Sequence, residues 1–375
     1  MLSLERARSF FPVVERVAYL DHASVGPIST RVVEALDRYA QEASRFAGLR
    51  REAQVAEVER VRGQAAALLG ASPEEVAFVR NTTEGLGCVA AGLDWRPGDR
   101  VVTCDLEYAS NLLPWRALAA RGVETQVLST DGRRLDAARV EEALGHPAVR
   151  LLTLSSVEFA SGFRHDLPRL GAACRERGVL FCVDAMQSLG CEPLDVRACG
   201  VDFLACGGSK WLLSVDGCGI FYASRAVAGR LTPRSVGPRS VVGSDEDASI
   251  TPTLRDDARR FEESKPNTPG IYALGAALDL LLELGPERVA GRVRELVDRL
   301  LAGLAARGAQ RVTAAEPGAR AGVVAFALPG EPAARTAARL AARGVRVSVR
   351  RGCVRASPHY YNQADEIDAL LRALR

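Results

Sequence analysis

The most constraining feature of this chain is a series of short, β-rich apolar runs that alternate with helical patterns. Nearly continuous apolar strands separated by helices are typical of a mainly parallel sheet that helices cover on both faces. The sequence therefore predicts an α/β fold, and such sheets bind ligands at the carboxyl ends of their strands. The seven expected strands are residues 75–80, 100–105, 125–129, 150–155, 179–184, 203–206 and 219–223.

The remaining patterns predict a second, smaller α/β unit at the C-terminus. Residues 231–269 have weak periodicity and are expected to form an extended loop, and Pro286 should end the helix that precedes it. We therefore expect two domains, residues 1–285 and residues 286–375. The other expected helices are 30–43, 52–69, 271–284, one ending near residue 306, 332–343 and 364–374, and the other expected strands are 322–328, 345–349 and 353–357.

Composition excludes several classes of protein. The formal net charge is only +3 over 375 residues, which leaves no basic footprint for nucleic acid. No apolar run reaches 18 residues, so we expect no membrane-spanning helix and a cytoplasmic location. The nine cysteines form no C-x-x-C pair and the four histidines are scattered, which argues against a disulfide framework and against a zinc site.

The use of lysine is more informative than the overall composition. Of 49 cationic residues only two, Lys210 and Lys265, are lysines, and the others are arginines. Arginine stays protonated and is a poor nucleophile, whereas a lysine amine can lose its proton and form a Schiff base. Either lysine is therefore a candidate for chemistry that a guanidinium cannot perform, with chance survival as the alternative.

Polar residues follow three of the expected strands. Thr82 and Thr83 open a helix after the first strand and offer an anion site, or simply an N-terminal cap. Asp184 ends a buried strand, where a carboxylate needs a partner unless it is a satisfied structural residue. Lys210 follows Ser209 and two glycines just after another strand. A phosphate site, an acid and a lysine in this order suggest pyridoxal phosphate (PLP), which a lysine holds as a Schiff base.

Eight segments spread over almost the whole chain carry one pattern. The sequence resembles the class V aminotransferase branch of PLP enzymes, which includes cysteine desulfurases, selenocysteine lyases, isopenicillin N epimerase-like proteins and C–S lyases. The resemblance implies a large domain of aspartate-aminotransferase-like fold and a homodimer with a shared active site. The segments are Y-L-D-H-A-S-V-G-P (19–27), V-R-N-T-T-E-G (79–85), E-Y-A-S-N-L-L-P-W (107–115), S-G-F-R (161–164), V-D-A-M-Q (183–187), G-G-S-K-W-L-L (207–213), R-F-E-E-S-K-P-N-T-P-G (260–270) and V-R-A-S-P-H-Y-Y-N (354–362).

The resemblance assigns cofactor-binding roles to five of these positions. Thr82 and Thr83 match the family's phosphate-binding pair, and Asp184 matches the partner of the pyridine nitrogen. Gln187 matches the side chain near the phenolic oxygen of PLP. Lys210 matches the lysine that forms the Schiff base and then acts as the base at the substrate's Cα.

Three further positions complete the implied site. Arg355 matches the arginine that holds the substrate's α-carboxylate, for which a bidentate guanidinium is well suited. His22 lies in the family's N-terminal substrate-side motif, where a purely structural role is the alternative. Ser209 stands where desulfurases often have a phosphate-binding histidine.

The sequence departs from the family pattern at four places. Ala109 takes the place of the histidine that stacks on PLP, which leaves Tyr108 beside it as a cofactor-binding candidate. Phe159 resembles the position of an asparagine in desulfurases, and Lys265 stands where a threonine often reaches the partner subunit's phosphate, with a surface lysine as the alternative. Cys353 is expected to be a strand residue rather than a nucleophile on a loop. Together these changes argue against sulfur transfer through a covalent persulfide.

The sequence therefore predicts a PLP-dependent enzyme that acts on an amino acid, most simply a desulfurase-like C–S lyase that works by β-elimination. An aminotransferase or an epimerase of the same family is the alternative outcome at the substrate's Cα. A catalytically silent PLP-fold binding protein is the alternative from another class. We expect no nucleic acid, membrane or metal partner.

Overall fold

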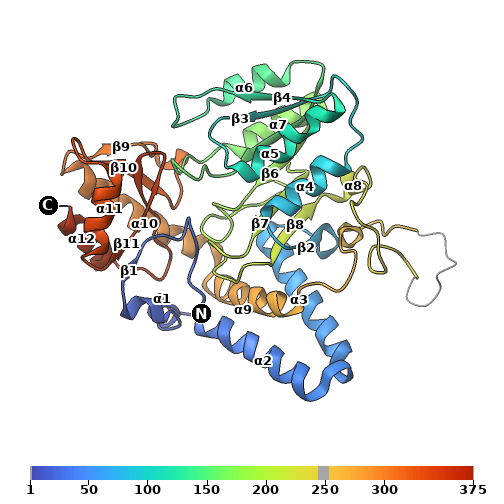
Figure 1. Ribbon diagram of the computed structural model, residues 1–375, viewed down its shortest axis with the longest axis horizontal. Coiled ribbons are helices and arrows are strands. Elements are labelled where there is room, and N and C mark those ends of the chain that lie inside the picture. Colours follow the sequence, from blue (N-terminus) through green and yellow to red (C-terminus); the bar gives the residue numbers. More distant parts are fainter. Residues whose placement is uncertain (1, 244–252, 375) are drawn as a thin grey trace.

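The computed structural model describes residues 2–243 and 253–374, which form a large and a small lobe (Figure 1). The large lobe is built on one seven-stranded sheet of order β2-β8-β7-β6-β5-β3-β4. Only β8 runs antiparallel to its neighbours, so the α/β class and the mainly parallel sheet are confirmed. The strands are β2 (Val76–Val79), β3 (Arg100–Cys104), β4 (Glu124–Leu128), β5 (Val149–Ser155), β6 (Leu180–Asp184), β7 (Phe203–Gly207) and β8 (Gly219–Ala223).

Helices cover both faces of this sheet, as the continuous apolar strands require. Successive residues of β6 face opposite sides, with Phe181 and Val183 packing into one core and Cys182 into the other. The first core is closed by α3 (Arg51–Leu69), α6 (Ala137–Leu144), α7 (Leu167–Arg177) and α9 (Thr268–Leu284). The second core is closed by α4 (Thr82–Gly92) and α5 (Leu113–Arg116), next to the short helix α8 (Arg225–Ala228).

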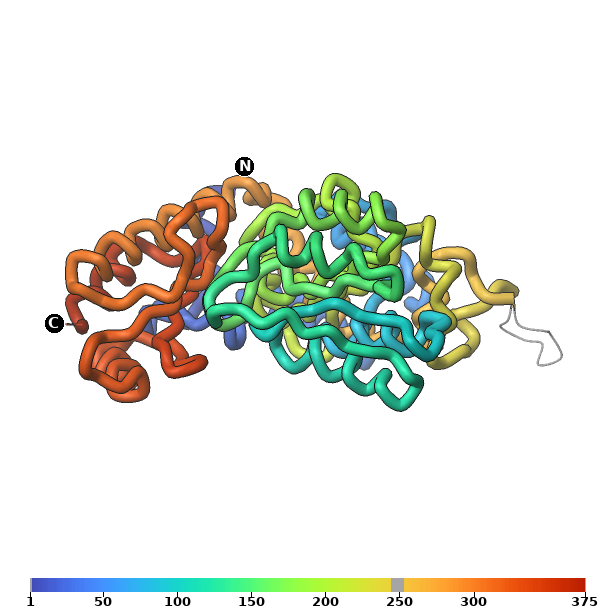
Figure 2. The backbone as a smooth tube through the Cα atoms, turned by 90° about the horizontal axis from the view of Figure 1, so that it is seen from above, coloured from blue at the N-terminus to red at the C-terminus, as the bar shows by residue number. Residues whose placement is uncertain are grey.

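The N-terminal segment connects the two lobes. Helix α1 (Leu4–Arg8) and helix α2 (Thr30–Phe46) lie below the sheet in Figure 1, where α2 packs against α9. Between these helices, β1 (Ala18–Tyr19) pairs in parallel with β11 of the small lobe. Both views place the N-terminus near the junction of the lobes (Figures 1 and 2). Residues 18–19 thus extend a sheet whose other strand lies more than 300 residues away in sequence.

The small lobe contains a four-stranded antiparallel sheet of order β12-β13-β10-β9. Its buried residues form a core distinct from those of the large lobe, and Leu20 and Ala23 of the N-terminal segment belong to it. Figure 2 shows this lobe at one end of the elongated molecule. Its elements are α10 (Pro286–Ala305), β9 (Gln310–Arg311), β10 (Val324–Ala327), α11 (Ala333–Ala341), β11 (Val345–Arg346), β12 (Ser348–Arg350), β13 (Cys353–Ala356) and α12 (Ala364–Ala373).

The expected loop over residues 231–269 is described in two parts. Residues 231–243 and 253–267 contain no element longer than a 3-10 turn over Ala258–Phe261, and residues 244–252 lie outside the described residues. Gly285 separates α9 from α10, where the proline was expected to end the helix. The division of the chain at residue 285 stays a prediction, because the N-terminal segment contributes to both cores. None of the helices over the described ranges is long and apolar enough to cross a membrane.

Candidate active site

A cavity of about 440 Å³ opens at the carboxyl ends of the parallel strands. This is the edge at which α/β sheets bind ligands, and the volume is within the range of small-molecule sites. Each contributing strand ends close to a polar residue that faces the same space. The predicted site residues that the structure brings together on its wall are Thr82, Thr83, Tyr108, Asp184, Gln187, Ser209 and Lys210.

One end of the cavity is formed by the N-terminus of α4. The Asn81 side chain caps the helix by accepting a hydrogen bond from the Glu84 N–H at 2.9 Å. Thr82 Oγ1 accepts one from the Gly207 N–H at 2.9 Å, which leaves the threonine's own hydroxyl hydrogen for another acceptor. The Thr83 and Ser110 hydroxyls are 2.8 Å apart. Because the first N–H groups of a helix have no intrahelical partner, this end suits an anion.

Asp184 has the opposite need: it is a buried acid, and its charged form requires a cationic partner. Its Oδ1 accepts a hydrogen bond from the Met186 N–H at 2.8 Å, whereas Oδ2 has no hydrogen-bond donor among the described residues. Burial raises the pKa of Asp184 to about 6, although the Met186 N–H and the charge of Lys210 act in the other direction. A protonated ring nitrogen in the cavity would give Oδ2 the donor that it lacks.

Lys210 lies in the same cavity with an uncommitted amine. Its Nζ is 5.8 Å from the centroid of the Tyr108 ring and makes no hydrogen bond or ion pair within the described part of the chain. Burial lowers the pKa of this amine to about 8, against the attraction of Asp184 and with help from the positive charge of Arg355. A neutral amine is the nucleophilic form, so this environment favours attack on an aldehyde.

A glycine keeps the loop that carries Lys210 against the N-terminal segment. The Gly26 N–H donates to the Ser209 carbonyl at 2.8 Å. A Cβ at position 26 would overlap the Lys210 carbonyl oxygen, so only glycine fits at this close approach. This contact brings Ser24 and Val25 to the wall of the cavity.

Two of the departures from the family pattern, Ala109 and Phe159, concern the aromatic side chains around the cavity. The Tyr108 ring lines the cavity and meets the edge of Phe159 at a centroid distance of 5.2 Å. Ala109 begins a 3-10 turn and does not line the cavity. Gln187 is fixed by two hydrogen bonds, to the Ala23 carbonyl at 3.0 Å and from the Trp211 indole at 2.8 Å. Tyr108 and Phe159 are thus both aromatic side chains on the cavity wall, and Ala109 is not.

Arg355 is buried directly behind this wall. Its guanidinium donates to Ser348 Oγ at 3.2 Å, to the Phe159 carbonyl at 2.7 Å and to Ser24 Oγ at 2.7 Å. Asp21 lies 3.8 Å away. Burial lowers the pKa of Arg355 to about 10. Because three of its five N–H groups are used, the guanidinium still has donors for a carboxylate.

Besides Arg355, which lies behind the wall, two more predicted residues lie outside this cavity. His22 is fully buried, with one ring nitrogen 2.7 Å from the Ser357 carbonyl and the other 2.7 Å from the Tyr361 hydroxyl. With both nitrogens occupied and no place on the cavity wall, the geometry favours the structural role of His22 over substrate contact. Lys265 is exposed and lines an adjoining cavity of about 400 Å³, which shares Gly217 with the first.

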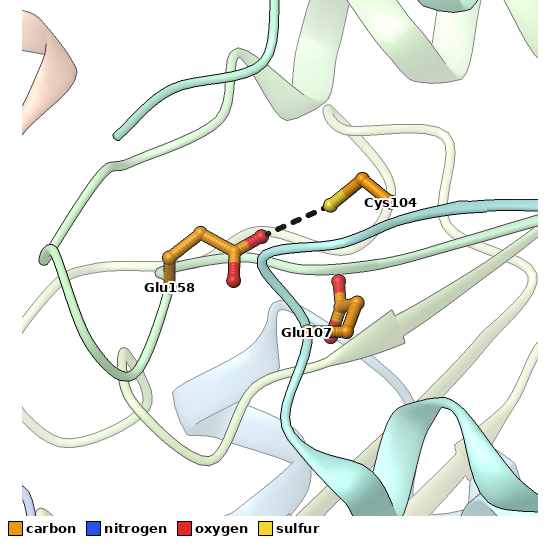
Figure 3. A group of neighbouring side chains, drawn as sticks. All are labelled: Cys104, Glu107 and Glu158. Carbon is orange, nitrogen blue, oxygen red and sulfur yellow. Dashed lines mark hydrogen bonds between the residues drawn. The ribbon is translucent and has the colours of Figure 1, made fainter. Parts of the chain in front are cut away.

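Sequence reasoning missed a buried cluster of Cys104, Glu107 and Glu158, which Figure 3 shows and which contacts the cavity through Ser155. Both Glu107 carboxylate oxygens accept from Ser155, at 2.5 Å from its N–H and 2.6 Å from its hydroxyl, and Ser155 lines the cavity. Glu158 Oε1 lies 3.6 Å from Cys104 Sγ and 2.9 Å from His165 Nε2, whereas Oε2 is buried and has no hydrogen-bond partner among the described residues.

The cluster is expected to hold protons rather than full negative charges. Burial raises the pKa of Glu107 well above its usual range and that of Glu158 to about 8, and it lowers the pKa of His165 to about 4. Burial and mutual repulsion disfavour ionisation of both carboxylates, although the charge of Arg351 acts in the other direction on Glu158. The signal that could have found the cluster is an acid, Glu107 or Glu158, placed shortly after a strand that ends at the site.

Comparison with known proteins agrees with this geometry. The family model described as Aminotransferase class-V matches residues 18–370. The chain belongs to this family. The membership predicted from eight sequence segments is thereby confirmed, together with the dependence on PLP that the family implies. A probable cysteine desulfurase from Pyrococcus abyssi is 30% identical over 392 residues, covering 99% of this chain and 96% of the relative.

Solved structures share the whole fold. A cysteine desulfurase from Thermococcus onnurineus NA1, in its apo form, superposes with a TM-score of 0.91 at 28% identity and covers 100% of this chain and 98% of its own. The cystine C–S lyase C-DES, in complex with its reaction product cysteine persulfide, has a TM-score of 0.89 at 27% identity, covering 97% of this chain and 98% of its own. A C-DES mutant carries glycine covalently linked to the PLP cofactor.

The residues of the cavity fit PLP by their own chemistry. Within the described ranges, Asp184 Oδ2 lacks a hydrogen-bond donor, the Lys210 amine has no hydrogen bond or ion pair, and the N-terminus of α4 offers N–H groups without an intrahelical partner. These three features correspond to the ring nitrogen, the aldehyde and the phosphate of one molecule. The site therefore has a complementary group for each reactive part of the cofactor.

Proposed function

We propose that this chain is a PLP-dependent lyase that cleaves the carbon–sulfur bond of cysteine-type amino acids by β-elimination. The observation that carries the proposal is that the Lys210 amine and Asp184 Oδ2 lie on one cavity and that neither has a hydrogen-bond or ion-pair partner among the described residues. PLP supplies an aldehyde for the lysine and a ring that accepts electrons from the substrate's Cα.

Each residue on the cavity wall has a separate role in this reaction. Lys210 would hold PLP through its aldehyde and, as a neutral amine, would take the proton from the substrate's Cα. Asp184 would keep the ring nitrogen protonated, and Thr82 and Thr83 would hold the phosphate at the N-terminus of α4. Tyr108, which lines the cavity beside Lys210, would be one aromatic side chain near the cofactor.

Arg355 is proposed to orient the substrate. Its guanidinium is fixed by three hydrogen bonds to Ser348, Phe159 and Ser24, so its remaining N–H groups point in a set direction. A planar pair of donors matches the two oxygens of an α-carboxylate. Substrate held in this way presents its Cα–H to Lys210 and its sulfur to the cavity mouth.

The hairpin that carries Arg355 supports elimination rather than persulfide transfer. Cys353 is the first residue of β13 and pairs with Arg350 of β12. Arg351 and Gly352 form the whole turn, with φ values of 46° and 76°, which are typical of a tight two-residue hairpin. A thiol in such a ladder has no mobile loop to carry it to a substrate's sulfur.

The sulfur is therefore proposed to leave directly. The Cα proton passes to Lys210, the Cα electrons form a double bond to Cβ, and the Cβ–S pair leaves with the sulfur. Hydrolysis of the remaining enamine with one water gives pyruvate and ammonia. Transamination or epimerisation would instead return a proton to the carbon framework and would release neither pyruvate nor a sulfur product.

We also propose a homodimer in which Lys265 of each subunit reaches the phosphate of the other. Lys265 makes no hydrogen bond or ion pair among the described residues and lines the cavity beside the cofactor site. It is one of only two lysines in an arginine-rich chain. Light scattering of the holoenzyme should give twice the mass of one chain.

Activity of the Cys353→Ser variant tests the proposed function. Wild-type and variant holoenzyme are assayed with L-cysteine, L-cystine and S-methyl-L-cysteine for pyruvate, sulfide and hydrogen exchange at Cα. We expect pyruvate from at least one of them and nearly unchanged rates in Cys353→Ser. A dead variant, or a persulfide that accumulates on Cys353, would establish sulfur transfer instead, and exchange without pyruvate would establish the epimerase alternative.

A further inference from the structure

The lysine loop, residues 208–218, joins β7 to β8 and is bent at a strained position close to Lys210. Leu213 has a φ of 57°, in the left-handed region that residues other than glycine rarely adopt. Its N–H donates to the Lys210 carbonyl at 3.1 Å, so the bend belongs to the same turn as the lysine. Backbone strain of this kind persists only where neighbouring residues hold the chain in place. The contacts around the lysine loop therefore determine where the Lys210 amine lies.

One of these contacts comes from the small lobe. The carbonyl of Trp211, the residue after Lys210, accepts a hydrogen bond from His359 Nε2 at 2.9 Å. Gly190 packs against the same carbonyl, where a Cβ would overlap its oxygen. Trp211 and His359 are both fully buried. A buried carbonyl needs a hydrogen-bond donor, and His359 provides it from outside the large lobe.

The surroundings of His359 fix its ring as the donor in this contact. Its Nδ1 accepts a hydrogen bond from the Tyr360 N–H at 2.8 Å, so the one hydrogen of a neutral imidazole lies on Nε2. Burial lowers the pKa of His359 to about 4, and the ring is therefore neutral near pH 7. The His359 N–H donates to Asn362 Oδ1 at 2.8 Å, which holds the backbone from which the ring extends.

His359 stands on the segment that carries the proposed substrate-binding arginine. Arg355 lies in β13, and His359 follows it by four residues. Between them, the Ser357 N–H donates to the Leu20 carbonyl at 2.7 Å, which ties the segment to the N-terminal strand region. Residues 355–359 thus join the group for the substrate's α-carboxylate to the loop that carries the base. Proton removal needs these two groups at a fixed separation, because the carboxylate contact decides where the Cα–H lies.

We propose that His359 is a positioning residue for Lys210. Its hydrogen bond to the Trp211 carbonyl holds the lysine loop at the distance from Arg355 that proton removal from Cα requires. This inference rests on the proposed role of Lys210 as the base. His359 acts only through the Trp211 carbonyl and takes no part in the proton transfer itself.

A matched pair of variants separates the two hydrogen bonds of the His359 ring. The amide nitrogen of a glutamine reaches about as far as Nε2 and can still donate to Trp211, whereas an asparagine reaches only about as far as Nδ1. Wild type, His359→Gln, His359→Asn and the control His146→Asn, at an exposed histidine, are assayed as holoenzyme for kcat and KM of pyruvate release. The apoprotein of each is tested for the pH dependence of recombination with PLP and for amide hydrogen exchange over residues 208–218.

We expect His359→Gln and His146→Asn to stay within about threefold of wild type, and His359→Asn to lose about 10- to 100-fold in kcat with KM changed by less than about twofold. In His359→Asn apoprotein the pH of half-maximal recombination should rise by about one unit, because a loosened loop exposes the Lys210 amine to water, and exchange over the lysine loop should be faster. Equal effects of glutamine and asparagine, or an unchanged recombination profile in both, would overturn the inference. The expected recombination and exchange results without pyruvate from any substrate would refute the proposed function and leave the role of His359 standing.

A measurement on the wild-type protein tests the inference even if His359→Asn does not fold. Nitrogen NMR of apoprotein labelled in its four histidines reports which ring nitrogen carries hydrogen, and the signal missing from His359→Gln identifies His359. We expect the hydrogen on Nε2. A hydrogen on Nδ1, with Nε2 unable to donate to the Trp211 carbonyl, would overturn the inference.

Discussion

Replacement of Arg355 by lysine tests how the protein recognises its substrate. The wild-type guanidinium donates hydrogen bonds to Ser348, Phe159 and Ser24, and its other N–H groups are left for a carboxylate. A lysine ammonium has only three donors on a single atom and cannot satisfy these three acceptors and the substrate together. At least one charged hydrogen bond to the substrate is lost.

The expected loss follows from that count. One hydrogen bond to a charged group contributes about 1.5–3 kcal/mol, so kcat/KM of Arg355→Lys should fall by about 10- to 150-fold. Steady-state kinetics with the best substrate measures this, and Arg343→Lys is the control for a conservative change at an exposed site. The absorbance of bound cofactor should be unchanged, because Arg355 lies behind the wall formed by Ser24 and Phe159. A variant within twofold of wild type, with cofactor bound, would show that another group holds the carboxylate.

Three further predictions follow from individual residues. Burial places the pKa of Lys210 at about 8, so the rate at which apoprotein recombines with PLP should reach half its maximum near pH 8 and level off about one pH unit higher. A rate that still climbs steeply at about pH 9.5 would indicate an ordinary lysine. The pKa of Glu158 is raised from 4.5 to about 8 in the fold, so its contribution to stability is full below pH 4.5 and is lost as pH rises through 8. Glu158→Gln should therefore gain urea resistance relative to wild type across that window, and a constant difference at all pH values would contradict this. Lys265→Ala should weaken PLP binding in equilibrium dialysis, whereas an unchanged affinity would leave Lys265 as a surface residue.

The sheet and the polar residues that follow its strands could be predicted from the sequence. Apolar continuity marks buried parallel strands, and the first polar residue after such a strand is placed by the fold rather than by its own contacts. Asp184 and Lys210 could therefore be assigned to one site before their distance was known. The same reasoning placed Cys353 in a strand, because a four-residue link leaves no room for a loop.

Contacts between segments far apart in sequence could not be predicted in this way. The pairing of β1 with β11 joins residues 18–19 to residues 345–346, and a strand of two residues has too little sequence pattern to predict its partner. The convergence of Arg350 and Arg355 on Ser24 depends on that pairing, since it brings the N-terminal segment to the hairpin. The Glu107–Glu158 pair was missed for a related reason, because burial of an acid is a property of the packed fold.

The central claim is that Lys210 carries the cofactor and performs the chemistry. Holoenzyme reduced with borohydride, digested and analysed by mass spectrometry reports which amine is bonded to PLP. We predict a single modified peptide, labelled at Lys210, that is absent from Lys210→Arg, a variant that keeps the charge but cannot condense with an aldehyde. A label on Lys265, or a protein that releases pyruvate at the wild-type rate in Lys210→Arg, would contradict the account.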